Sequence, residues 1–123
     1  MKTLGVDWGE KRIGLALTSG NFAEPYGVIP SSEWLFKTLK EEGIEKVVLG
    51  LPEGKHEKRV RNLGRKIEQE LKIPVVLRSE ILTSRLAQEK LIQAGKGKKD
   101  RRELDAASAA FLLQEYLDEQ ARA

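Results

Sequence analysis

Short apolar runs separated by turn residues predict three strands at the start of the chain. Residues 2 to 8 and 12 to 18 are mostly apolar and are joined by Gly9-Glu10-Lys11, a glycine-containing connection typical of a β-hairpin. Residues 23 to 29 predict a third strand, which Pro25 places toward the edge of the sheet because proline cannot donate a ladder hydrogen bond. The first part of the chain is therefore expected to form an antiparallel meander.

From Ser32 onward the pattern alternates between helices and strands. Ser32 is expected to cap a helix through Glu42, with Trp34 among the apolar residues at helical spacing and Gly43 at its end. The remaining pattern predicts a buried strand over 46–50, a polar helix over 57–71, a strand over 74–78, and helices over 83–94 and 100–120.

This order of elements predicts the α/β class. Right-handed crossovers carry the chain from the meander into parallel strands, giving one mixed sheet flanked by helices. A length of 123 residues suits a single domain, residues 1–123.

Composition excludes several classes of protein. No apolar stretch approaches the roughly 20 residues that span a bilayer, and the N-terminus leads into a strand without a secretory apolar region, so we expect a cytoplasmic protein with no membrane partner. Cysteine is absent, which excludes disulfides, thiolate metal sites and cysteine nucleophiles. His56, the only histidine, is expected to be a surface group without acids nearby at ligand spacing.

Asp7 is a carboxylate at the end of a strand that otherwise belongs to the core. Strand alternation places Asp7 on one face with Gly5 and Gly9, while Leu4, Val6 and Trp8 point to the other face, where Trp8 is expected in the core. A carboxylate on such a bare face is costly to bury unless it is protonated, hydrogen-bonded or bound to a cation. The simpler alternative is an Asp-Trp-Gly turn between hairpin strands.

Two more acids are expected near Asp7. Parallel strands share their carboxyl-terminal edge, which would carry Asp7, the turn at Gly50-Leu51-Pro52 and Glu80. Glu80 could instead only begin the next helix, where a negative charge is favourable. Asp105 lies in a helix that Asp100 already caps, beside small residues that let the helix approach a sheet closely.

Three carboxylates without cysteine or a usable histidine form an all-oxygen site, which suits Mg²⁺ or Mn²⁺ better than zinc. A pair of such ions can activate water and stabilise the leaving oxygen of a phosphodiester displacement. The predicted chemistry is therefore metal-dependent phosphodiester hydrolysis.

Positive charge is concentrated in two segments, residues 55–66 and 96–102, although the net charge is only +3. The clusters are the electrostatic footprint expected for a phosphate backbone, or else simply solvated faces. Arg12 and Lys11 alternate in direction, so at most one lines the acidic face, and Arg12 either pairs with an acid or contacts substrate. The candidate nucleic-acid contacts are Lys11, Arg12, Lys58, Arg59, Arg61, Lys96, Lys98, Lys99 and Arg101.

In three segments, Gly5–Ala16, Gly50-Leu51-Pro52 and 104–117, the chain resembles the YqgF family. Members of that family are assigned either to Holliday junction resolution or to maturation of the 5′ end of pre-16S rRNA. The resemblance implies an RNase H-like fold. The run from Gly5 to Ala16 is similar to that family's Asp-x-Gly-x-Lys-Arg-Ile-Gly-x-Ala element. Gly50-Leu51-Pro52 resembles its Gly-Leu-Pro turn, and the segments 104–110 and 116–117 resemble its last helix.

A fourth motif of the family, Asp-Glu-Arg-Leu-Thr-Thr/Ser, is only partly present. The chain has Ser79 in place of the first acid and Ile81 in place of the arginine, and it retains Glu80 and Thr83. These changes lower the negative charge beside the predicted metal site, and they remove an arginine that would contact phosphate or support that site.

The resemblance implies that Asp7, Glu80 and Asp105 are metal-binding catalytic acids for Mg²⁺ or Mn²⁺, with Thr83, Arg12 and Lys11 as secondary candidates. It favours structured RNA, the pre-16S 5′ end, over branched DNA. Residues 96–102 are expected to form a basic loop that becomes ordered on nucleic acid. Paired incision of a junction would call for a two-fold dimer, but no dimer helix stands out, so we expect a monomer or weak homodimer.

Two other functions remain open. A non-catalytic nucleic-acid-binding module would retain the fold and the basic surface while Ser79 and Ile81 mark a decayed site. The Asp-x-Gly element also resembles the first phosphate loop of sugar kinases and actin-like ATPases, but those enzymes clamp nucleotide between two such domains and 123 residues supply one.

Overall fold

Five strands form one sheet in the computed structural model, which describes residues 1–52, 54–79 and 101–122. Their order across the sheet is β3-β2-β1-β4-β5. β1 pairs antiparallel with β2 and β2 with β3, whereas β1–β4 and β4–β5 are parallel. The strands are β1 (Thr3–Asp7), β2 (Ile13–Ser19), β3 (Phe22–Ile29), β4 (Lys46–Leu51) and β5 (Val75–Ser79).

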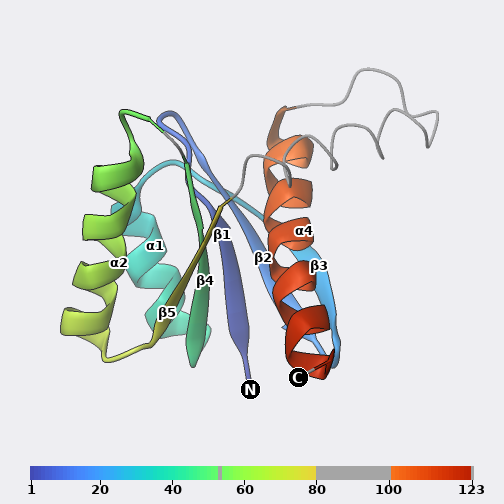
Figure 1. Cartoon of the computed structure of the whole chain (residues 1–123). Helices are drawn as coiled ribbons and strands as arrows, with labels where there is room; N and C mark the ends of the chain where they lie inside the picture. Colours follow the sequence, from blue (N-terminus) through green and yellow to red (C-terminus); the bar gives the residue numbers. More distant parts are fainter. Residues whose placement is uncertain (53, 80–100, 123) are drawn as a thin grey trace.

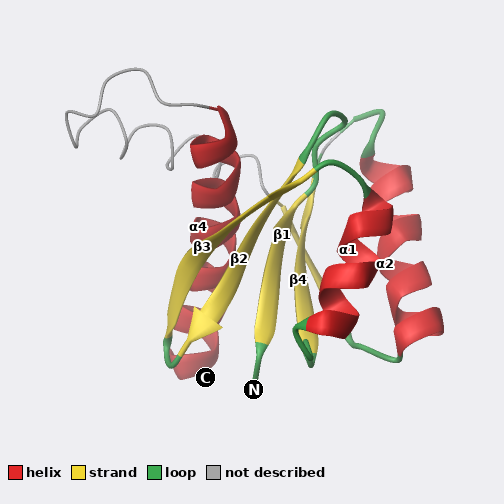
Figure 2. Ribbon diagram, turned by 180° about the vertical axis from the view of Figure 1, so that it is seen from behind, coloured by secondary structure: helices red, strands yellow, loops and turns green. Residues whose placement is uncertain are grey.

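Helices cover both faces of the sheet. Of the helices in the described ranges, two lie on one face and the last lies on the other (Figure 1, Figure 2). They are α1 (Ser32–Glu41), α2 (Glu57–Leu71) and α4 (Arg101–Arg122). The predicted meander, the parallel strands and the helix over 57–71 are confirmed, while the helix expected over 83–94 lies outside the described residues.

The two faces of the sheet have cores of different character. The face toward α1 and α2 packs large side chains, among them Leu4, Val6 and Leu35, all fully buried. Trp8 belongs to this core with 9% of its surface exposed, as its strand position predicted. The core toward α4 mixes Ala16 and Ala109 with the larger Leu112, Leu113 and Tyr116. The alanines let the helix lie close to the strands beside them.

Gly5, in the middle of β1, lies very close to α4. A Cβ atom built on Gly5 would lie 2.8 Å from the Cβ of Leu113 and 2.9 Å from the carbonyl oxygen of Ala109. Real Cβ atoms essentially never come this close to such atoms. The bare face expected from the alternation of β1 is thus in direct contact with the backbone of α4.

The start of α1 differs from the prediction. Ser31, not Ser32, occupies the N-cap position, and its side chain makes no capping hydrogen bond. Trp34 is 49% exposed, because α1 buries Leu35 and Leu39 and the neighbouring position faces outward. The Lys37 ammonium lies 5.0 Å from the centre of the Trp34 ring, so this tryptophan packs against a cation and not the core.

Arg78 joins the last described strand to α4. Its guanidinium donates to both carboxylate oxygens of Glu119, at 2.5 and 2.8 Å, and lies 3.4 Å from Glu115. The hydrogen bond from Arg78 is the main cause that lowers the pKa of Glu119. This bidentate contact ties the edge strand to the second half of the helix.

Among the helices that the structure describes, none has both the length and the apolar character that a membrane span requires.

Gly5→Ala should destabilise the fold by about 1–3 kcal/mol, because the new methyl group must displace α4. Gly64→Ala is the matched control. Its Cβ would make an ordinary 3.4 Å contact with Val75, and alanine inside a helix gains roughly 0.5–1 kcal/mol over glycine. Urea unfolding measures both variants, and equal effects would contradict the close approach.

The Arg78–Glu119 contact should make stability depend on pH. The folded-state pKa of Glu119 lies below its ordinary value of 4.5. The contact therefore stabilises the protein fully at pH values above 4.5, and this contribution is lost as the pH falls through the lowered pKa. The free-energy difference between wild type and Glu119→Gln, from chemical unfolding, should therefore shrink in acid. In an Arg78→Gln background the difference should no longer depend on pH, and an unchanged slope there would show that another group is responsible.

Candidate active site

The carboxyl-terminal ends of the three parallel strands meet at one edge of the sheet. Asp7, the last residue of β1, is in register with Gly50 on β4, and Gly50 is in register with Arg78 on β5. On its other side Asp7 pairs with Gly14 of β2. The predicted meeting of Asp7 with the Gly-Leu-Pro turn is confirmed, and both direct neighbours of Asp7 in the sheet are glycines.

Asp7 lies on the face of the sheet that α4 covers. Gly5 contacts α4, and a residue two positions along a strand points to the same face. Asp7 is half-buried and is the last residue of β1, while Trp8 and Gly9 lie in the connection to β2. The two direct neighbours of Asp7 in the sheet, Gly14 and Gly50, carry no side chain.

Asp105 reaches the same place from α4. A Cβ atom on Gly14 would lie 2.1 Å from the carbonyl oxygen of Asp105 and 3.0 Å from the backbone nitrogen of Ala106. The first turns of the helix therefore rest directly on Gly14. Since facing residues of antiparallel strands have Cα atoms about 4.5–5.5 Å apart, the helix segment that carries Asp105 lies beside Asp7.

Arg12 supplies the partner of Asp105. Its Nε donates to Oδ2 of Asp105 at 2.5 Å, and the two side chains are 27% and 29% exposed. Arg12 precedes β2 by one residue, so alternation turns it toward the same face as Gly14. Of the two roles left open for Arg12, the structure shows the ion pair.

The third predicted acid is not described. Glu80 and Thr83 lie outside the described residues, as do Lys96, Lys98 and Lys99. Ser79, which precedes Glu80, ends β5 in register with Leu51, so the chain reaches the carboxyl-terminal edge at that point. Within the described ranges no three acidic, histidine or cysteine side chains form a metal-binding group. The metal site remains a prediction.

The predicted basic contacts of the described chain lie near the same edge or along α2. Lys11 is exposed in the hairpin, and Lys58 is exposed on α2. Arg61 is paired with Glu57 at 3.2 Å. The guanidinium of Arg59 lies 5.6 Å from the centre of the Trp8 ring. For Arg101 only its place at the start of α4 is described.

His56 is more enclosed than expected. Its ring centre lies 5.2 Å from that of Trp8, and its Nε2 lies 3.6 Å from a carboxylate oxygen of Glu10. The expectation concerned acids at ligand spacing in the sequence, and the fold brings Glu10 to His56 from elsewhere. The partner comes from the hairpin between β1 and β2, so spacing around His56 in the sequence carried no signal for it.

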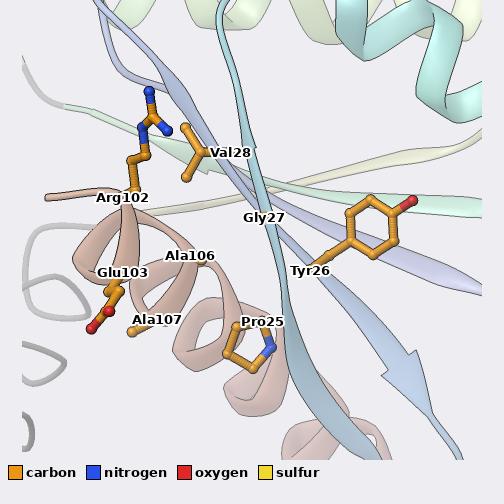
Figure 3. A pocket seen from close by; sticks show the side chains of 8 residues that line it. All are labelled: Pro25, Tyr26, Gly27, Val28, Arg102, Glu103, Ala106 and Ala107. Carbon is orange, nitrogen blue, oxygen red and sulfur yellow. The ribbon is translucent and has the colours of Figure 1, made fainter. Parts of the chain in front are cut away.

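A cavity of about 530 Å³ opens between β3 and the beginning of α4. Figure 3 shows that its two walls come from the edge strand and from the first turns of the helix. Because the same turns carry Asp105, the cavity adjoins the acidic edge. The sequence reasoning missed it, since its lining comes from two distant segments and forms no recognisable motif: Pro25, Tyr26, Gly27, Val28, Arg102, Glu103, Ala106 and Ala107.

Comparison with known families matches residues 1–119 to the model "RuvX: Holliday junction resolvase". The chain belongs to the RuvX family, also called YqgF. Two curated relatives, both named "Putative pre-16S rRNA nuclease", support this membership. The protein of Shouchella clausii is 36% identical, covering 98% of this chain and 96% of its own length. The protein of Prosthecochloris aestuarii is 38% identical, covering 95% and 93%.

Solved structures confirm the RNase H-like fold class expected for a RuvX protein. The RuvC protein of T. thermophilus in complex with a Holliday junction substrate matches with a TM-score of 0.64 at 13% identity, over 98% of this chain and 96% of that one. The fowlpox virus Holliday junction resolvase matches with a TM-score of 0.68 at 14% identity, over 98% and 99%. At these identities the likeness establishes the fold alone.

Arg12→Gln should lower stability by about 1–3 kcal/mol, because it leaves the partly buried Asp105 carboxylate without its charged donor. Arg61→Gln is the control. It breaks an exposed pair with Glu57, at 44% and 43% side-chain exposure, which contributes about 0.3–0.5 kcal/mol. Urea unfolding of both variants gives the comparison, and a loss for Arg12→Gln no larger than the control would refute a structural role for the Arg12–Asp105 pair.

Proposed function

We propose that this RuvX protein is a metal-dependent nuclease that hydrolyses phosphodiester bonds at the carboxyl-terminal edge of its sheet. The observation that carries the proposal is the seating of α4 on Gly14, which brings Asp105 beside Asp7. Two acidic side chains from distant segments share one edge and one face there.

The donor set fits a divalent cation. Asp7, Asp105 and Glu80 would hold Mg²⁺ or Mn²⁺, whose preferred ligands are carboxylate oxygens. The bound ions would lower the pKa of the attacking water and stabilise the leaving oxygen. Arg12 holds Asp105 through Oδ2, and this hydrogen bond orients the carboxylate as outer-shell partners of metal ligands do.

Nucleic acid is the substrate class that the charges support. Cations flank the acidic edge in the hairpin and on α2, and the chain carries a net charge of +3. A polyanion attracted to these side chains would pass over Asp7 and Asp105. Phosphate contacts of this kind set position and affinity without reading sequence.

Within this class we favour the 5′ end of pre-16S rRNA, in the cytoplasm. The support is the name shared by curated relatives that align over nearly the whole of this chain, such as those of Shouchella clausii and Prosthecochloris aestuarii. The second candidate is a Holliday junction, which the description of the family model favours. The two substrates differ in geometry, and a cleavage assay separates them.

Asp7→Asn should reduce cleavage of a pre-16S 5′-end RNA, in Mg²⁺ or Mn²⁺, by at least about 100-fold, because it removes one of the charges that hold the ions. Asp118→Asn removes an equal charge from an exposed site near the other end of α4, where Oδ1 of Asp118 accepts a hydrogen bond from Gln114. That control should cleave like the wild type. A four-way DNA junction assayed in parallel tests the second candidate.

Metal-induced stabilisation provides an independent readout. Mn²⁺ at 100 times its dissociation constant should stabilise the wild type by about 2.7 kcal/mol, and Asp7→Asn should abolish this gain while Asp118→Asn retains it. Metal-induced stabilisation without cleavage of either substrate would favour the non-catalytic module. Equal cleavage by wild type and Asp7→Asn would place the activity elsewhere and refute the assignment.

A further inference from the structure

A second cavity opens at the same edge of the sheet, on the face opposite Asp7. It measures about 250 Å³ and is lined by the hairpin, by the start of α1 and by α2. Trp8 lies between it and the core, and we call the cavity the Trp8 pocket. Its lining residues are Trp8, Gly9, Glu10, Ile13, Pro30, Ser31, Ser32, Arg59 and Leu63.

Arg59 is the cation of the Trp8 pocket. Its guanidinium lies 5.6 Å from the centre of the Trp8 ring, a cation–π contact that holds the side chain over the pocket. Within the described part of the chain no carboxylate lies in ion-pair contact with Arg59, whereas Arg12, Arg61 and Arg78 each have one. In the described part of the chain, the Arg59 guanidinium is therefore held at the pocket by an aromatic ring and not by a carboxylate.

The other polar groups of the pocket suit an anion. Ser31 and Ser32, two residues with hydroxyl side chains, line the pocket, and the Ser31 side chain makes no capping hydrogen bond to α1. Glu10 is the only acid of the lining, and its carboxylate lies 3.6 Å from His56 Nε2. A guanidinium and hydroxyl donors are the groups that proteins use to hold phosphate oxygens.

The size of the pocket limits its ligand. Pockets that enclose a drug-sized molecule occupy about 300–1,000 Å³, so a volume of about 250 Å³ suits a small group. Trp8 is 9% exposed and offers too little ring surface to stack a base. A phosphate fits these properties better than a nucleobase.

The position of the pocket relates it to the acidic edge. Trp8 follows Asp7 in the chain, and alternation sends the two side chains to opposite faces at the end of β1. A strand of nucleic acid that crosses this edge would meet both sites, one on each side of the sheet. The two sites would then contact different phosphates of one strand.

We propose that the Trp8 pocket binds a phosphate of the substrate strand through Arg59 and the hydroxyl groups of Ser31 and Ser32. The inference rests on the proposed nuclease function for the identity of the strand, and on the geometry of the pocket for the contact. It assigns Arg59 to substrate positioning, away from the reacting bond.

The test measures binding of a labelled single-stranded RNA as a function of salt, in EDTA, so that no cleavage occurs. Arg59→Gln should weaken binding and lower the slope of log K against log salt by about 0.7, the value of one phosphate contact on a single strand. Arg65→Gln removes the same charge from the same helix, but it lies outside the pocket and its guanidinium contacts Asn62. It should leave the slope near that of the wild type.

Trp8 fluorescence reports on the pocket itself. In a Trp34→Phe background Trp8 is the only tryptophan, so its emission should change when RNA binds, and Arg59→Gln should remove that change. Inorganic phosphate at the same phosphate concentration should cause a smaller change, since it lacks the other contacts of the strand. Circular dichroism spectra that match the wild type would exclude misfolding of the variants.

Equal slopes for Arg59→Gln and Arg65→Gln, or Trp8 emission that responds to inorganic phosphate but not to RNA, would overturn the proposal. These outcomes are distinct from failure of the nuclease function. If no substrate is cleaved but RNA binding still depends on Arg59, the nuclease assignment fails and the phosphate pocket stands. If cleavage depends on Asp7 but the slope does not depend on Arg59, the pocket fails and the nuclease stands.

Discussion

The contact between α4 and the bare backbone of β1 and β2 is the constraint on which the site depends. Gly5 and Gly14 leave no room for even one methyl group between sheet and helix. The backbone of α4 therefore lies directly against the backbone of the two strands, which fixes the position of the helix on the sheet. Asp105 is thereby held beside Asp7. Side chains in place of Gly5 and Gly14 would push the helix away and separate the two carboxylates.

The charges at this edge are arranged around the same contact. Asp7 and Asp105 lie on the α4 face, where Arg12 pairs with Asp105 and partly balances the negative charge. On the opposite face Arg59 keeps its guanidinium over Trp8. An edge with acids on one side and a cation without a described carboxylate partner on the other suits a ligand that carries phosphates and crosses from face to face.

Local pattern was enough to predict most of the fold and the place of Asp7. The alternation of Gly5 and Asp7 with large apolar residues predicted a bare face, and the small residues after Asp105 predicted a helix that approaches it; both agree with the structure. Pairings between distant segments could not be predicted. Arg12, the partner of Asp105, comes from the hairpin, as does Glu10, the acid beside His56. The hydrophobic periodicity of one element does not show which side chain of a distant segment will lie next to it.

Anomalous diffraction from crystals soaked in Mn²⁺ tests the central claim most directly, because it locates the ion without reference to activity. The account predicts a manganese peak at the carboxyl-terminal edge, roughly 2.0–2.2 Å from a carboxylate oxygen of Asp7 and from one of Asp105, the distance of an oxygen ligand. Manganese bound by only one of these two carboxylates, or found only at another place on the molecule, would contradict it.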